Sequence, residues 1–147
     1  MAYVRREAVA IDAISQSWSC LSDAQLDQRI EILREKFARR RSDTTDLRNA
    51  FAAVREAAHR QTGLRPFRVQ LMGALGLYHR QIVELVTGEG KTLVAALAAT
   101  LLGWQRRPVH VVTINDYLAE RDAELGEPLF RRCGLGCGAV VGDSPLN

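Results

Sequence analysis

The stretch VTGEGKT, residues 86–92, contains the residue types that bind the phosphates of a nucleotide. Glycines let the backbone fold around an anion, so that several N–H groups and a helix N-terminus point at it. A lysine then reaches the outer phosphates, and the hydroxyl of the next serine or threonine helps to hold magnesium. Gly88, Gly90, Lys91 and Thr92 occupy these positions, and we predict that they bind phosphate.

The lysine of this stretch is unusual in a chain that uses arginine for nearly every positive charge. Of 20 basic residues, only Lys36 and Lys91 are lysines. A compact ammonium fits a phosphate cradle, whereas the wide planar guanidinium of arginine does not fit it in the same way. We therefore favour phosphate binding over the alternative of a glycine turn with a solvated lysine. Leu85 replaces a further glycine of the usual loop, which is typical of helicase-like motors.

The half of the chain around this loop alternates between strand-like and helix-like segments. The hydrophobic patterns and cap residues predict strands over residues 82–86, 109–113 and 138–141, a helix over 92–103, and a helix from Asn115 or Asp116 to about Gly126 with a short continuation from Pro128. Alternation of this kind predicts a parallel sheet with right-handed crossovers. The predicted fold class is therefore α/β.

The first half of the chain is predicted to be helical. Ser22 and Gln25 have the spacing of a capping box. Apolar residues follow at helical spacing, first at Leu26, Ile30, Leu33 and Phe37, and then from Leu47 to a helix end at Gly63. We also predict a shorter helix over residues 7–18 and one that begins at Pro66 with Val69, Met72 and Leu75 on its apolar face.

Charge and cysteine content bear on three possibilities: a nucleic-acid partner, a disulfide framework and a zinc site. The net charge of +3 is spread evenly along the chain, so we expect no nucleic-acid partner. Arg39–Arg41 end a predicted helix, where cations are favoured by the helix dipole, although a contact with anionic lipid or nucleic acid is the alternative. Cys20, Cys133 and Cys137 are an odd number with no nearby further ligands, so neither a disulfide framework nor a zinc site is predicted.

The sequence shows no segment that would direct the chain into or across a membrane. Its longest nearly uncharged apolar stretch, Thr92–Trp104, has 13 residues and is too short to span a bilayer as a helix. The N-terminal residues lack the compact apolar stretch and small-residue cleavage site of a signal peptide. We therefore expect a cytoplasmic protein.

Three stretches in this order resemble the SecA family of bacterial preprotein translocase ATPases. They are AFAAVREAAHRQTGLRPFRVQLMGAL from Ala50, VTGEGKTLVAALAA from Val86 and VHVVTINDYLAERDAE from Val109. The resemblance implies an incomplete RecA-like sheet of the P-loop, helicase type, with an α-helical N-terminal extension. The corresponding division is residues 1–48 for the extension and 49–147 for a partial nucleotide-binding domain that ends before the Walker B motif.

The resemblance also implies roles for individual residues. Gln70 would read the adenine of ATP, with Arg65 and Phe67 nearby, and its amide has the donor and acceptor groups that this requires. Gly88, Glu89, Gly90, Lys91 and Thr92 would form the loop that binds ATP, with Thr92 contacting the Mg²⁺ bound with ATP. Asn115 and Asp116 are interpreted as helix caps, and Arg121 and Asp122 are expected to face solvent or to support the site from outside.

The function implied is the ATP-binding part of a motor that couples ATP hydrolysis to preprotein translocation across the cytoplasmic membrane. The partners implied are the SecYEG channel, preproteins and anionic lipid, with the chain cytoplasmic or peripheral on the cytoplasmic face of the membrane. Because Walker B and the second motor domain are expected to be missing, we predict no complete catalytic set and no turnover by the chain alone. We also expect a completing chain or partner, since the strand over 82–86 would lack a neighbour.

Two other hypotheses remain. The chain could be a non-catalytic remnant that binds nucleotide or a partner without turnover. It could also be a helicase-like nucleic-acid ATPase, because the phosphate loop is of the same type. The even charge balance and the specificity of RPFRVQ and NDYLAERD count against the helicase.

Overall fold

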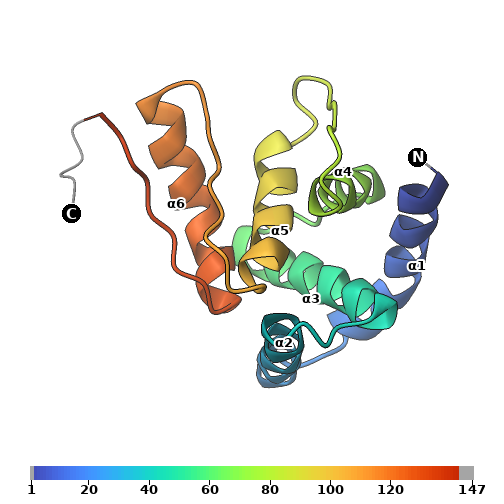
Figure 1. The fold of residues 1–147 in the computed structure, drawn as a ribbon. Coiled ribbons are helices and arrows are strands. Elements are labelled where there is room, and N and C mark those ends of the chain that lie inside the picture. The colour runs from blue at the N-terminus through green and yellow to red at the C-terminus, as the bar shows by residue number, and fades with distance from the viewer. Residues whose placement is uncertain (1, 143–147) are drawn as a thin grey trace.

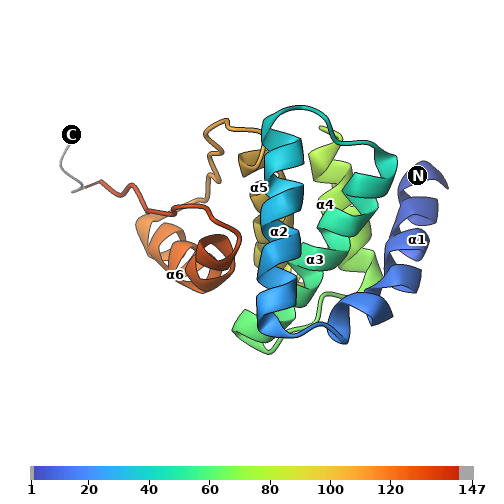
Figure 2. The same ribbon diagram turned by 90° about the horizontal axis from the view of Figure 1, so that it is seen from below.

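The computed structural model describes residues 2–142 and contains six helices in that range (Figure 1). They are α1 (Ala2–Ser19), α2 (Asp23–Ala38), α3 (Thr44–Thr62), α4 (Arg68–Tyr78), α5 (Lys91–Gly103) and α6 (Asp116–Arg132). Figures 1 and 2 show α3 crossing the middle of the molecule, with α1 and α4 on one side of it and α6 on the other.

The predicted parallel sheet is wrong, and with it the α/β, incomplete RecA-like fold class. No residue between 2 and 142 belongs to a strand, and the segments 82–86, 109–113 and 138–141 lie outside the helices as irregular chain. A strand needs a second strand about 4.8 Å away for its hydrogen bonds, whereas a helix closes its bonds within one segment. The β-branched residues of these segments favour extended backbone, but Ile82, Val112 and Val140 are exposed instead of buried.

The core forms where helices converge on α3. Every residue from Ala50 to Ala58 is buried, which is the burial expected of a central helix. Five of these nine residues are alanines, and their small side chains let α1, α2, α5 and α6 all pack against α3. The helices that cover α3 contribute large apolar side chains, including Ile11, Phe37, Leu97 and Leu129.

The helix ends follow the sequence in most places. The predicted capping box is confirmed, since Gln25 N donates to Ser22 Oγ at 3.3 Å and Ser22 N donates to Gln25 Oε1 at 2.9 Å. Gly63 ends α3 in the left-handed conformation, with φ of 72°. Two helices differ from prediction: α1 begins five residues before the predicted start at residue 7, and α4 begins at Arg68, two residues after Pro66.

The buried face of α4 and the extent of α6 also differ from prediction. Val69 was expected on the apolar face of α4 but is exposed, because the buried face of α4 is centred on residues such as Leu71 and Leu75. The helix α6 runs through Pro128 without the predicted break near Gly126. Proline removes one helical hydrogen bond, and burial of Leu129, directly after it, anchors the last turn against the core.

Close approach of α4 and α5 depends on a glycine. A Cβ at Gly73 of α4 would lie 3.0 Å from Val94 Cγ1 of α5. A side chain at this position would require the Val94 side chain to move by a few tenths of an ångström. Gly73 therefore lies where α4, which carries Gln70, approaches α5, which begins with Lys91.

Buried arginines join helices that are distant in sequence. Arg55 of α3 is only 6% exposed, and its guanidinium donates to Asp12 Oδ1 at 2.8 Å, to Ser15 Oγ at 2.9 Å and to the carbonyl of Pro66 at 2.8 Å. It therefore fastens α1 to the segment that leads into α4. Hydrogen bonds from Arg55 and then from Arg68 hold the pKa of Asp12 below its usual value.

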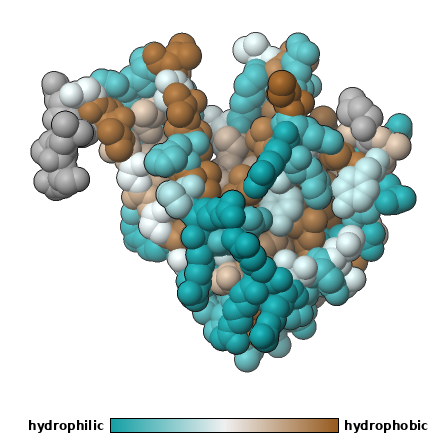
Figure 3. Space-filling model, in the orientation of Figure 1, coloured by the Kyte–Doolittle hydropathy of each residue, from teal (hydrophilic) through white to brown (hydrophobic). Residues whose placement is uncertain are grey.

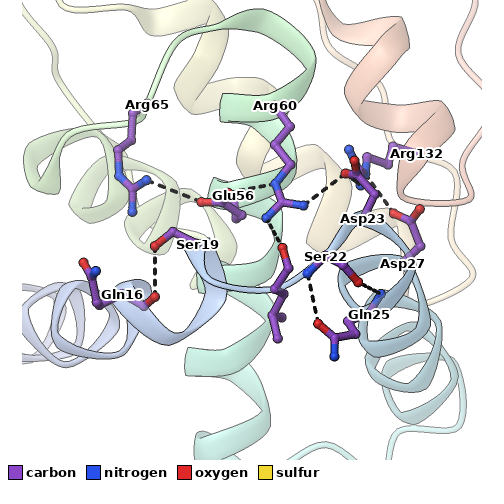
Figure 4. Close-up of polar contacts among 11 residues, drawn as sticks. Gln16, Ser19, Ser22, Asp23, Gln25, Asp27, Glu56, Arg60, Arg65 and Arg132 are labelled. Carbon is purple, nitrogen blue, oxygen red and sulfur yellow. Dashed lines mark hydrogen bonds and ion pairs between the residues drawn. The ribbon is translucent and has the colours of Figure 1, made fainter.

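A second polar network fixes the C-terminal end of α6 (Figure 4). Arg132 donates to Asp27 Oδ1 at 2.8 Å and to Asp23 Oδ1 at 2.5 Å, both on α2. Asp23 also accepts from Arg60 of α3 at 3.0 Å, and Arg60 pairs with Glu56, which accepts in turn from Arg65. One continuous set of charges thus links α6, α2, α3 and the segment before α4.

No helix in the described residues 2–142 is both long enough and apolar enough to cross a membrane.

Replacing Arg55 tests whether its buried contacts hold the helices together. We expect Arg55→Met to lower the free energy of unfolding by about 2–4 kcal/mol, because Ser15 and the Pro66 carbonyl lose a buried donor. Urea titration followed by circular dichroism measures the change. Arg5→Met, at an exposed position of α1, is the control and should change stability by less than about 0.5 kcal/mol. Equal stability of the two variants would contradict a structural role for Arg55.

The end of α4 offers a stabilising substitution. Arg80 has a φ of 60°, and Gln81 N donates to the carbonyl of Gly76 at 2.9 Å, which is the hydrogen bond of a Schellman motif. A left-handed conformation costs a residue with a Cβ roughly 1–2 kcal/mol, while glycine adds flexibility to the unfolded chain. We therefore expect Arg80→Gly to raise stability by a net amount of about 0.5–1 kcal/mol, measured by thermal melting. Arg29→Gly, inside α2, should lower it.

Candidate functional site

The glycine-rich loop between α4 and α5 has a backbone that only glycine adopts easily. Gly88 has a φ of 89° and Gly90 a φ of 78°, both in the left-handed region. Glu89 closes the turn, since its N–H donates to the carbonyl of Val86 at 3.2 Å and its carboxylate accepts from Val86 N at 3.1 Å. The loop is therefore held in a defined turn by its own residues.

Gln70 of α4 is hydrogen-bonded to this loop. Its Nε2 donates to the carbonyl of Glu89 at 2.9 Å, and its Oε1 accepts from Phe67 N at 2.9 Å. A Cβ at position 90 would lie 2.5 Å from Gln70 Nε2, so Gly90 is needed for this contact as well as for its φ. Gln70 is 8% exposed, and it joins the start of α4 to the loop.

The N-terminus of α5 faces the loop with its backbone donors unused by a cap. Gly90 is the N-cap residue and makes no side-chain hydrogen bond to the helix, and the first helical bond is from Val94 N to the carbonyl of Gly90 at 3.1 Å. The N–H groups of the first turn and the positive end of the helix dipole are suited to an anion. Lys91, at the first position of α5, is exposed. The free N–H groups and the lysine ammonium together suit a bound phosphate group.

Thr92 makes a contact that the sequence analysis did not anticipate. Its Oγ1 donates to Asp122 Oδ1 of α6 at 3.3 Å. Arg121 donates to the same oxygen from Nε at 3.0 Å and from a terminal nitrogen at 2.7 Å. Asp122 was expected either to face solvent or to support the site from outside. Its contact with Thr92 of α5 agrees with the second of these expectations. Asp122 comes 30 positions after Thr92 in the sequence, and no local pattern connects the two residues.

A groove of about 610 Å³ lies between α5 and α6, and Figure 3 shows the surface hollowed there. Small residues of α5, including Ala95, Ala96 and Ala99, form one wall, and the segments around Val111 and Val140 form the other. Of the predicted binding residues, Thr92 alone lines the groove. The groove thus begins at the loop and extends away from it along α5.

The two residues expected near the adenine lie just before α4. Phe67 is the N-cap residue and is 72% exposed. Arg65 contacts Glu56 Oε2 at 3.4 Å and keeps part of its side chain in solvent. Both are on the same side of Gln70 in the chain, and neither contacts the glycine-rich loop through a hydrogen bond within residues 2–142.

One of the two predicted caps of α6 is present. Asn115 is the N-cap, and its Oδ1 accepts from Leu118 N at 2.9 Å. Asp116 is the first residue of α6, and its Oδ2 accepts from Gly142 N at 3.2 Å, which ties the end of the described chain to the helix. The interpretation as a helix cap is confirmed for Asn115, whereas the Asp116 carboxylate accepts from Gly142 N and not from an N–H group of the helix.

The cysteines lie in different environments. Cys133 is buried at the end of α6, where burial raises the pKa of its thiol to about 12 and its carbonyl accepts from Trp104 Nε1 at 2.9 Å. Cys20 and Cys137 are exposed. Within residues 2–142, no cluster of three or more histidine, cysteine or acidic residues is arranged to hold a metal ion.

Comparison with known proteins places this sequence in a family. The SecA DEAD-like domain family matches residues 1–146. A protein translocase subunit SecA 2 of Chlorobium chlorochromatii is 46% identical over 138 residues, covering 93% of this chain. A chloroplastic protein translocase subunit SecA of Ostreococcus lucimarinus is 48% identical over 131 residues, and a protein translocase subunit SecA of Caldicellulosiruptor saccharolyticus is 46% identical over 133, each covering 89% of the chain.

The chain spans only a small part of each of these relatives, namely 21%, 14% and 15% of their lengths in the same order. The match nevertheless runs through the glycine-rich loop, the segment that carries Gln70 and the helix that carries Asp122. The resemblance inferred from the sequence is therefore correct, and the chain belongs to the SecA DEAD-like domain family.

Proposed function

We propose that the chain is the ATP-binding part of a SecA-type motor that couples ATP hydrolysis to protein translocation across the cytoplasmic membrane. One observation carries the proposal: the uncapped N-terminus of α5 follows a loop with two left-handed glycines and begins with Lys91. Membership of a family whose relatives are named protein translocase subunits supports the assignment of the motor.

The phosphate-binding role falls to the loop and the first turn of α5. The N–H groups of Lys91 and Thr92 and the positive end of the helix dipole would bind the phosphate oxygens. The ammonium of Lys91 is exposed and can reach the outer phosphates. The hydroxyl of Thr92 would hold Mg²⁺, which neutralises phosphate charge when bound. Glu89 contributes its backbone to the loop and uses its carboxylate to hold Val86 N.

We propose that Gln70 reads the adenine, as the resemblance implies. A glutamine amide has two N–H donors and two acceptor lone pairs, and the contacts with Glu89 and Phe67 use one of each. The remaining donor and acceptor suffice for the paired contacts that an adenine edge requires. Phe67 is exposed beside it and offers an aromatic face, while Arg65 is held by Glu56.

The partners of the whole motor are proposed on the family alone. They are a SecYEG-type channel, preproteins and anionic lipid, with the chain on the cytoplasmic face of the membrane. The exposed apolar side chains of Val112, Ile114 and Val140 agree with a further proposal, that a completing chain or partner covers this part of the surface. The division into residues 1–48 and 49–147 also remains a proposal, and its boundary falls within α3.

Replacing Lys91 tests the proposed phosphate site. We expect Lys91→Ala to weaken binding of a fluorescent ATP analogue by about 10- to 100-fold, because a charge-assisted hydrogen bond of about 1.5–3 kcal/mol is lost. Fluorescence titration of the purified chain with MgCl₂ present measures the affinity. Lys36→Ala removes the other lysine of the chain, on α2, and should bind like the wild type. No binding by the wild-type chain, or equal binding by Lys91→Ala, would disprove the phosphate site.

Replacing Gln70 tests the proposed base recognition separately. We expect Gln70→Ala to reduce the preference for ATP over GTP by about tenfold, since a site built to hydrogen-bond a base loses its discrimination with the donor. Competition titrations with the two nucleotides give the ratio. Gln61→Ala, an exposed glutamine of α3, is the control. A variant that loses affinity for both nucleotides equally would assign Gln70 to the support of the loop and not to the base.

A further inference from the structure

We propose that Asp122 is a positioning residue for the cation of the nucleotide site and acts through the Thr92 hydroxyl. The inference rests on the proposed function, and it concerns a residue on a different helix from the phosphate loop. The contact that carries it is the hydrogen bond from Thr92 Oγ1 to Asp122 Oδ1, 3.3 Å long, which joins the second residue of α5 to α6.

The direction of this hydrogen bond decides what Thr92 can do. A threonine hydroxyl has one hydrogen and two lone pairs. A carboxylate only accepts, so the hydroxyl hydrogen must point at Asp122 and both lone pairs must point elsewhere. A cation is bound by lone pairs and repelled by the hydroxyl hydrogen. Asp122 therefore holds the Thr92 side chain in the orientation that a Mg²⁺ ion requires.

The carboxylate of Asp122 is itself fixed by its neighbour. Arg121 donates twice to Oδ1, and the Asp122 side chain is 23% exposed. Within residues 2–142 these contacts all fall on Oδ1, which leaves Oδ2 as a further acceptor. A negative charge held this close to Thr92 also favours a divalent cation at the hydroxyl.

The position of Asp122 depends on how α6 is anchored. Arg132, near the C-terminal end of α6, pairs with Asp23 and Asp27 of α2 (Figure 4). Leu129 packs into the core one turn before that end. These contacts fix one end of α6 and place Asp122, nearer its other end, beside the first turn of α5.

A purely structural alternative is that the Thr92–Asp122 bond only ties α6 to α5.

The two roles differ in how nucleotide affinity depends on Mg²⁺. A positioning role predicts that Asp122→Ala loses roughly 10- to 100-fold in affinity for a fluorescent ATP analogue in MgCl₂, as is usual when a residue that orients a metal ligand is removed. In EDTA the affinity of Asp122→Ala should equal that of the wild type. Titrations of the full chain under both conditions measure the two affinities, and thermal melting records stability. Thr92→Val should show the same loss in MgCl₂, and adding Asp122→Ala to it should bring little further change.

Three variants control for charge and for folding. Glu124→Ala removes the same charge from an exposed position of α6 and should keep the affinity of the wild type in MgCl₂. Thr92→Ser keeps the hydroxyl and should keep the response to Mg²⁺. If Asp122→Ala does not fold, Asp122→Asn preserves the side-chain shape while removing the charge, and it should still lose part of the response.

The outcomes separate this inference from the proposed function. Equal losses with Mg²⁺ and with EDTA, or no loss from Asp122→Ala or Asp122→Asn, would overturn the positioning role while leaving ATP binding intact. A wild-type chain that binds no ATP analogue under either condition would overturn the proposed function and this inference together. A loss confined to MgCl₂ and shared by Thr92→Val supports the role of Asp122.

Discussion

Close packing around α3 is the constraint on which the rest of the structure depends. The alanines among residues 50–58 leave room for four helices to reach one central helix. Larger side chains there would separate α5 from α3, and α5 carries the candidate site at its first residue. In a densely packed core there are few voids, so a shift of one helix displaces its neighbours. The core that positions the loop before Lys91 therefore contains no residue of that loop.

The sequence predicted the helices and failed on the sheet for one physical reason. A helix is specified by contacts three and four residues apart, so Ser22, Gln25 and Gly63 mark helix ends correctly from sequence alone. A strand is completed by a second segment that local pattern does not specify. Val109–Thr113 has the composition of a buried strand, yet this segment lies partly in solvent beside the groove. The β-branched residues of this segment favour extended backbone, but they do not specify a second strand for it to pair with.

The candidate site divides in the same way. The positions of Gly88 and Gly90 in the loop follow from the motif, and their left-handed φ angles agree with it. The contact of Gln70 with Glu89 joins α4 to the loop, and that of Thr92 with Asp122 joins α5 to α6, over 19 and 30 positions of the chain. No spacing rule connects such residues, and a polar residue on a helix is more often a solvated one. Tertiary structure was needed to find them.

The loop is consequently supported from two sides that differ in rigidity. On one side, Gln70 belongs to α4, which packs against α1 and α5 through fully buried apolar residues such as Leu71 and Leu75. On the other side, Asp122 belongs to α6, whose buried residues are only Gly126 and Leu129. Its other anchors are the partly buried Phe130 and the ion pairs of Arg132 with exposed carboxylates. Exposed ion pairs are weak and are screened by salt, and segments with little buried apolar area open most readily. The support at Gln70 is therefore the fixed one, and the support at Thr92 is the one that a bound ligand can most easily shift.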